Sequence, residues 1–175
     1  MLVSLKSFLF LFVILLSTNF IQCGETSNCI EHLDFYLDVA KWKQAFKNSN
    51  EQASIVEFTL KNENVNNWTE LVTVQKFPPF ESSVDQYYLL FVETLKKSVS
   101  PDPAYSRIIN KKENSLLFEW WIPENSSFAQ HEWFKLIKTP SSILILRYTT
   151  KKLEQVEKVR KNWEKILDSA TSCAD

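Results

Sequence analysis

Residues 55–77, IVEFTLKNENVNNWTELVTVQKF, decide how the rest of this chain is arranged. Apolar and polar residues alternate over residues 56–60 and again over residues 72–75, which is the pattern of half-buried strands. The asparagines between the two runs can cap a short helical turn whose one large apolar residue is Trp68. The stretch therefore predicts a strand, a helical turn and a returning strand, with Trp68 as a structural anchor in the core.

The residues before and after this stretch predict a further strand and a helix. Upstream, residues 39–46 predict a strand, and the polar run 47–52 predicts a hairpin turn into the strand that follows. Downstream, a Pro-Pro pair ends the returning strand, and Ser82 or Ser83 can cap an amphipathic helix that reaches Val99. This helix has one apolar face, so we expect it to pack on a sheet.

The second half of the chain reads as successive strands and a last helix. Short polar turns separate the strands, so an antiparallel meander is the simplest interpretation. Thr150 can cap the last helix, which has an apolar flank as far as Ala170 and includes Trp163 as a structural residue. The predicted strands cover residues 105–109, 116–122, 128–138 and 143–149.

The first 23 residues read as a secretory signal peptide. Lys6 is their only charged residue, and residues 8–16 are an unbroken apolar run, too short for a spanning helix of about 20 residues. The predicted organisation is a signal peptide over 1–23 and a single domain over 24–175, secreted or periplasmic, with no membrane span after cleavage. A lipoprotein acylated on Cys23 is the alternative, which Gln22 disfavours because the residue before a lipidated cysteine is normally very small.

Two further cysteines lie near the two ends of the mature chain. An exported protein meets an oxidising environment, so Cys29 and Cys173 are predicted to form a disulfide that pins both termini. The alternative is two free thiols in terminal segments that never meet.

Composition narrows the function classes. The chain has 20 basic and 21 acidic residues mixed along its length, which gives no electrostatic reason to expect nucleic acid as a partner. Gly24 is its only glycine, so the usual glycine-rich loops that bind phosphates are excluded. The sequence predicts no cofactor.

Several motifs resemble a family of small exported proteins of Gram-negative bacteria. They are NWTELVTVQ at 67–75 and LILRYTTKKLEQVEKVRKNWEKIL at 144–167, within a similarity over about residues 41–170. The resemblance implies an α+β fold similar to the PsbP-like superfamily, an α/β/α sandwich with a largely antiparallel sheet of about six or seven strands. It supplies no catalytic motif, so its signature positions carry no assigned chemistry: Trp68, Thr69, Glu70, Thr73 and Gln75. Thr69 and Glu70 are expected to cap and solvate the turn.

Aromatic residues are the main candidates for ligand binding. Trp120 and Trp121 must face opposite sides of their strand, and Trp133 lies in the strand that follows. If helices cover both faces, these tryptophans belong to the core. The alternative is an aromatic-lined cleft that takes a peptide, a glycan or a small apolar ligand, with Gln75 orienting it.

Metal chemistry and acid–base chemistry have little support in the sequence. His131 and Glu132 are neighbours in a predicted strand and so point to opposite faces, and a metal site would have to recruit Glu119 from another strand. We therefore predict no metal site and an exposed His131 imidazole.

Two function hypotheses remain open at this point. The first is a non-enzymatic exported protein that binds an unknown protein, peptide or small-molecule partner through a sheet face or a groove at the sheet edge. The second is a hydrolase or metal-dependent enzyme whose carboxylates and His131 converge only in the folded chain. The ligand and the oligomeric state are open under both.

Overall fold

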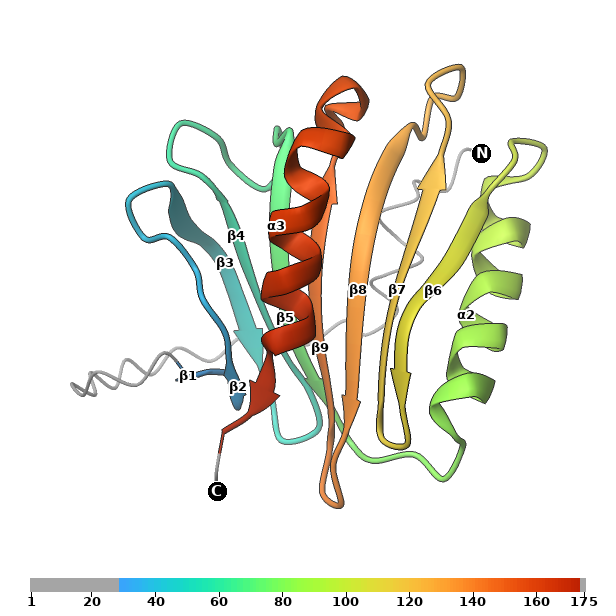
Figure 1. The fold of residues 1–175 in the computed structure, drawn as a ribbon. Helices are drawn as coiled ribbons and strands as arrows, with labels where there is room; N and C mark the ends of the chain where they lie inside the picture. The colour runs from blue at the N-terminus through green and yellow to red at the C-terminus, as the bar shows by residue number, and fades with distance from the viewer. Residues whose placement is uncertain (1–28, 174–175) are drawn as a thin grey trace.

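A seven-stranded antiparallel sheet runs through the centre of the fold (Figure 1). The structure is a computed structural model, and it describes residues 29–173. The predicted strands after residue 100 and the returning strand of the opening stretch are all present, which confirms the antiparallel sheet. In spatial order the strands are β3 (Trp42–Ser49), β4 (Ser54–Leu60), β5 (Glu70–Phe77), β9 (Ile143–Thr150), β8 (Gln130–Lys138), β7 (Ser115–Ile122) and β6 (Tyr105–Lys112).

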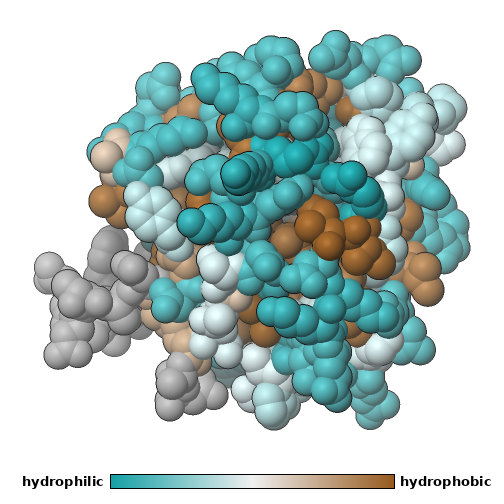
Figure 2. All heavy atoms as spheres, viewed as in Figure 1, coloured by the Kyte–Doolittle hydropathy of each residue, from teal (hydrophilic) through white to brown (hydrophobic). Residues whose placement is uncertain are grey.

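Helix α3 (Val156–Ser169), preceded by a single 3-10 turn (Leu153–Gln155), covers one face of the sheet. Its Trp163 is buried and stacks on Tyr148 of β9, with ring centroids 3.9 Å apart. Trp42 of β3 meets both rings edge-on. Figure 2 shows a mostly hydrophilic surface on this side of the molecule, because the apolar flank of α3 is turned onto the sheet.

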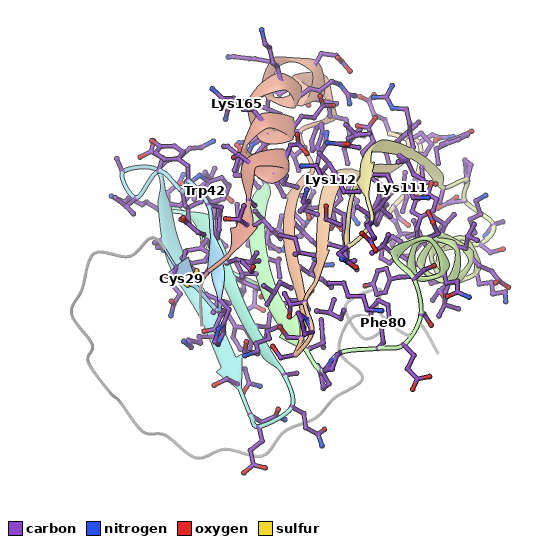
Figure 3. The ribbon with its side chains drawn as sticks, turned by 60° about the horizontal axis from the view of Figure 1, so that its bottom comes forward. Cys29, Trp42, Phe80, Lys111, Lys112 and Lys165 are labelled. Atoms are coloured by element: carbon purple, nitrogen blue, oxygen red, sulfur yellow. A yellow bond between two sulfur atoms is a disulfide. The ribbon has the colours of Figure 1, made fainter. Side chains whose placement is uncertain are left out.

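Helix α2 (Val84–Val99) packs on the opposite face, so the sheet lies between two helical layers (Figure 3). Val84, Leu95 and Val99 are buried against strands β7, β8 and β9. The helix begins where the sequence predicts, because Ser83 and Gln86 form a reciprocal capping box: each side chain bonds the other residue's backbone N–H.

The last helix begins later than predicted. Thr150 is the final residue of β9, and its hydroxyl accepts a hydrogen bond from the backbone N–H of Lys152, two residues on. This local bond shapes the turn that leaves the sheet, so Thr150 is no helix cap.

The connection between β4 and β5 also differs from its prediction. The strands pair as expected, with Phe58 opposite Val72, but no helical turn joins them. The Asn64 side-chain oxygen instead accepts hydrogen bonds from the backbone N–H groups of Asn66 and Asn67. These bonds form an Asx turn, which satisfies backbone groups that a helical turn would otherwise use. Trp68 is half-buried and belongs neither to the apolar core between α3 and the sheet nor to the one between α2 and the sheet. The Lys151 ammonium lies 3.9 Å from its ring centroid. The prediction of Trp68 as a core anchor is wrong.

The two ends of the described chain meet in a small three-stranded sheet. It consists of β1 (Cys29–Ile30), β2 (Leu33–Asp34) and β10 (Thr171–Ser172). A disulfide joins Cys29 to Cys173, as predicted. The two-residue turn between β1 and β2 places Glu31 and His32 at φ values of 48° and 68°, the left-handed region that a type I′ turn requires.

The predicted signal peptide over residues 1–23 lies outside the described residues. Within residues 29–173, no helix has both the length and the apolar character needed to cross a membrane.

Candidate functional site

An apolar cavity of about 310 Å³ lies between α2 and the sheet, and we name it the α2 cavity. Strands β5, β7, β8 and β9 supply its floor, and α2 supplies its wall. Phe91 of α2 packs against Phe118, Trp120 and Phe134, so the aromatic part of the wall is continuous with the core. The lining residues are Gln75, Phe77, Tyr87, Leu90, Phe91, Thr94, Leu95, Ser98, Trp120, Gln130, Phe134, Ile145 and Arg147.

The α2 cavity has a charged residue in its floor. Arg147 is 4% exposed, and its guanidinium lies 5.9 Å from the ring centroid of Phe134. The nearest carboxylate belongs to Glu132, whose Oε1 is 3.8 Å from Nη1 of Arg147. Glu132 accepts a hydrogen bond of 2.9 Å from the Trp120 indole and one of 2.7 Å from the Thr149 hydroxyl.

Tyr87 joins this charged floor from the helix side. Its phenol stacks on Phe80 and tilts against Phe134, and Phe80 lies in the segment that leads into α2 (Figure 3). Burial raises the pKa of Tyr87 to about 12, with the positive charge of Arg147 acting in the opposite direction. Tyr87 is therefore a neutral hydrogen-bond donor at physiological pH.

The structure separates the residues that the sequence singled out for binding. Trp120 and Gln75 line the α2 cavity. Trp121 lies on the other face of β7, half-buried and stacked between Tyr105 and His131. Trp133 is fully buried in the apolar core between α3 and the sheet. The opposite orientation of Trp120 and Trp121 is as predicted.

A second cavity, of about 510 Å³, lies on the α3 face and contains a polar cluster. Glu119 is at its centre, 1% exposed. Its carboxylate lies 2.8 Å from Nε2 of His131 and 2.5 Å from Nη2 of Arg107, and it also accepts a hydrogen bond from Arg160 of α3. His131 is 4% exposed, so the prediction of an exposed imidazole is wrong: the ring packs under Trp121 and against Trp133.

The chemistry open to this cluster is limited. Burial alone would raise the pKa of Glu119, but hydrogen bonds from His131 and Arg160 lower it to about 2. The carboxylate is thus held ionised and is a poor general acid. Within residues 29–173, no three His, Cys, Asp or Glu side chains are grouped in a way that could hold a metal ion.

Two signature positions of the family resemblance have structural partners. The Thr69 hydroxyl and backbone N–H both donate to Glu63, which closes the turn before β5. Glu70 is buried, not solvated as expected: its carboxylate accepts hydrogen bonds from Lys41, Lys152 and Tyr148. Burial would raise the pKa of Glu70, but these three hydrogen bonds lower it.

The sequence interpretation missed Arg147, although a signal for it existed. Arg147 directly follows the apolar run 143–146, and an arginine inside a strand that is buried on both faces is unusual. The α2 wall residues carried no such signal, because the apolar spacing of a helix predicts a packed face and not a gap beside it.

Comparisons with known proteins agree with the fold. Neither the protein-family models nor the curated proteins give a match. Among solved structures, the chain is similar to the solution structure of cyanobacterial PsbP (CyanoP) from Synechocystis sp. PCC 6803. The two share 12% sequence identity and a TM-score of 0.51, over 87% of this chain and 98% of that chain. Identity this low shows the fold alone: the chain has a PsbP-like fold.

Proposed function

We propose that this chain is an exported, non-enzymatic protein that binds a small apolar or amphipathic ligand in the α2 cavity. The observation that carries the proposal is the lining, in which aromatic and aliphatic side chains from α2 and four strands surround a few polar groups. Small-molecule sites have this character, and a volume of about 310 Å³ is at the lower end of their range of about 300–1,000 Å³. Export is inferred from the signal-peptide pattern, and the Cys29–Cys173 disulfide is consistent with it.

A hydrolase or metal-dependent enzyme is the second candidate, and the contact between Glu119 and His131 is what favours it. Against it, two arginines hold the Glu119 carboxylate in its ionised form, in which it is a poor general acid. Calorimetric titration with zinc tests the metal-dependent form: saturable heat that His131→Ala abolishes would favour an enzyme over a binding protein.

The experiment for the binding function uses the neutral fluorophore N-phenylnaphthylamine, which brightens in apolar sites. Leu89 and Leu90 are neighbours on α2 and are each 65% exposed, but only Leu90 lines the α2 cavity. We expect the wild type and Leu89→Trp to bind the probe equally. Leu90→Trp and Thr94→Trp place a large ring in or over the cavity and should weaken binding at least about tenfold.

Circular dichroism checks that all variants keep the fold. The proposal is wrong if the wild type does not bind the probe, or if Leu89→Trp weakens binding as much as Leu90→Trp.

A further inference from the structure

Two buried polar groups on the α2 side of the sheet lack hydrogen-bond partners, and one of them, Arg147, lines the α2 cavity. Nε of Arg147 is one, and the hydroxyl of Thr73 is the other. Thr73 and Arg147 are directly paired across β5 and β9, so their side chains lie side by side on the same face of the sheet. Buried donors without acceptors are rare in folded proteins and cost free energy, so an acceptor is expected at this position.

Glu132 does not supply that acceptor. Both of its oxygens already accept hydrogen bonds, from Trp120 and from Thr149, and its distance of 3.8 Å from Arg147 exceeds a hydrogen bond. Glu132 therefore compensates part of the positive charge of Arg147 without satisfying its N–H groups. Tyr87 is the titratable group that faces this pair from α2, and it is neutral.

We propose that the ligand of the α2 cavity is a free fatty acid, a single-chain amphipath with a carboxylate head. This inference rests on the proposed binding function. The carboxylate would accept hydrogen bonds from the guanidinium of Arg147 and the hydroxyl of Thr73, and a planar carboxylate matches the fork of N–H donors that a guanidinium presents. Gln75 lies two residues beyond Thr73 on the same face of β5 and lines the cavity, so its amide is within the same polar region.

The apolar part of the lining, from both α2 and the strands, fits the other end of such a ligand. Phe77, Leu90, Phe91 and Ile145 offer hydrocarbon surface beside the polar floor and no charged group. A saturated chain gains from burial roughly in proportion to the apolar area it removes from water. The polar part of the cavity lining thus suits a carboxylate, and the apolar part suits a chain.

The test compares dodecanoate, dodecanol and dodecylammonium as competitors of bound N-phenylnaphthylamine. The sample is the exported protein, purified from the cells that produce it and then stripped of lipid. Three proteins are compared: the wild type, Glu132→Gln, and the double variant Glu132→Gln with Arg147→Met. The double variant removes both charges, so no unpaired buried charge remains to unfold it.

We expect the wild type to prefer dodecanoate over dodecanol at least about tenfold, as a hydrogen bond to a charged group implies. Glu132→Gln should widen this preference, because a competing negative charge is gone. The double variant should bind dodecanol as the wild type does and lose the preference for dodecanoate.

Each contrary result has a distinct meaning. Equal binding of dodecanoate and dodecanol by the wild type, or a preference for dodecylammonium, overturns the fatty-acid inference and leaves the binding function standing. A preference for dodecanoate that survives in the double variant overturns the role of Arg147. Failure of all three competitors and of the probe itself overturns both proposals.

Discussion

Replacing Glu119 with Gln should destabilise the fold in a way that depends on pH. The Glu119 carboxylate is 1% exposed and contacts Arg107, His131 and Arg160. Its pKa is about 2, compared with an ordinary value of 4.5. A carboxyl group with this difference between folded and unfolded states contributes about 3 kcal/mol to the free energy of unfolding at neutral pH.

The sign of the pH dependence follows from the lowered pKa. The unfolded chain takes up the proton near its ordinary pKa of 4.5, and the folded chain does so only near 2. The stabilisation by Glu119 is therefore complete above the unfolded value and is lost as the pH falls towards the folded value.

Urea unfolding of the wild type and Glu119→Gln across the acid range measures this contribution. We expect a difference of about 3 kcal/mol at neutral pH, shrinking as the pH falls from 4.5 towards 2. Glu93→Gln is the control, because Glu93 also forms an ion pair, with Lys97, but at the exposed surface of α2. It should leave stability unchanged. A difference for Glu119→Gln that is the same at every pH, or no larger than that of the control, would refute the reasoning.

Three further changes test the packing and the termini. Replacing Cys29 and Cys173 with serine should lower the free energy of unfolding by about 2–5 kcal/mol, measured by urea unfolding, because a link across 144 residues restricts the unfolded chain. Trp163→Ala should cost about 3–5 kcal/mol and Trp68→Ala much less, since only Trp163 is in the core, and thermal melts of the pair rank them; equal losses would contradict the burial difference. His32→Gly should raise the free energy of unfolding by about 1 kcal/mol, because glycine adopts a φ of 68° without strain, and a loss of stability would argue against the left-handed turn.

Different observations support the fold, the binding function and the fatty-acid ligand. The PsbP-like fold rests on the sheet, its two helical layers and the similarity to the cyanobacterial structure. The binding function rests on the α2 cavity of this chain, and the fatty-acid inference rests on the unpartnered Nε of Arg147 in that cavity and on the unpartnered Thr73 hydroxyl beside Arg147. A shared fold does not imply a shared ligand, so these side chains are the place to test function.

The strands and helices were predictable because their signals are local. Neighbouring residues in β5 and β7 point to opposite faces of the strand, so the alternation of apolar and polar residues can be read from a few adjacent positions. The Ser83 cap depends only on Gln86, three positions away. The β4–β5 turn failed for an equally local reason, since the Asn64 side chain offers the backbone a competing set of hydrogen bonds.

The sites were not predictable in the same way. Periodicity assigns a residue to a face of its strand but says nothing of which strand lies beside it. The pairing of β5 with β9 joins segments far apart in the chain, and it alone brings Thr73 next to Arg147. In the same way, only the docking of α3 places Arg160 against Glu119.

The sequence by itself determined the antiparallel strands, the start of α2, the opposite orientation of Trp120 and Trp121, and the cysteines available for a disulfide. Only the tertiary structure decided that Trp68 is half-buried, that His131 is buried, and that a cavity remains beside α2. The physical reason is the distance along the chain over which each effect operates. Hydrogen bonds and apolar spacing within one element involve residues that are near neighbours in sequence. Burial and unpaired charge depend on every element that packs around a residue.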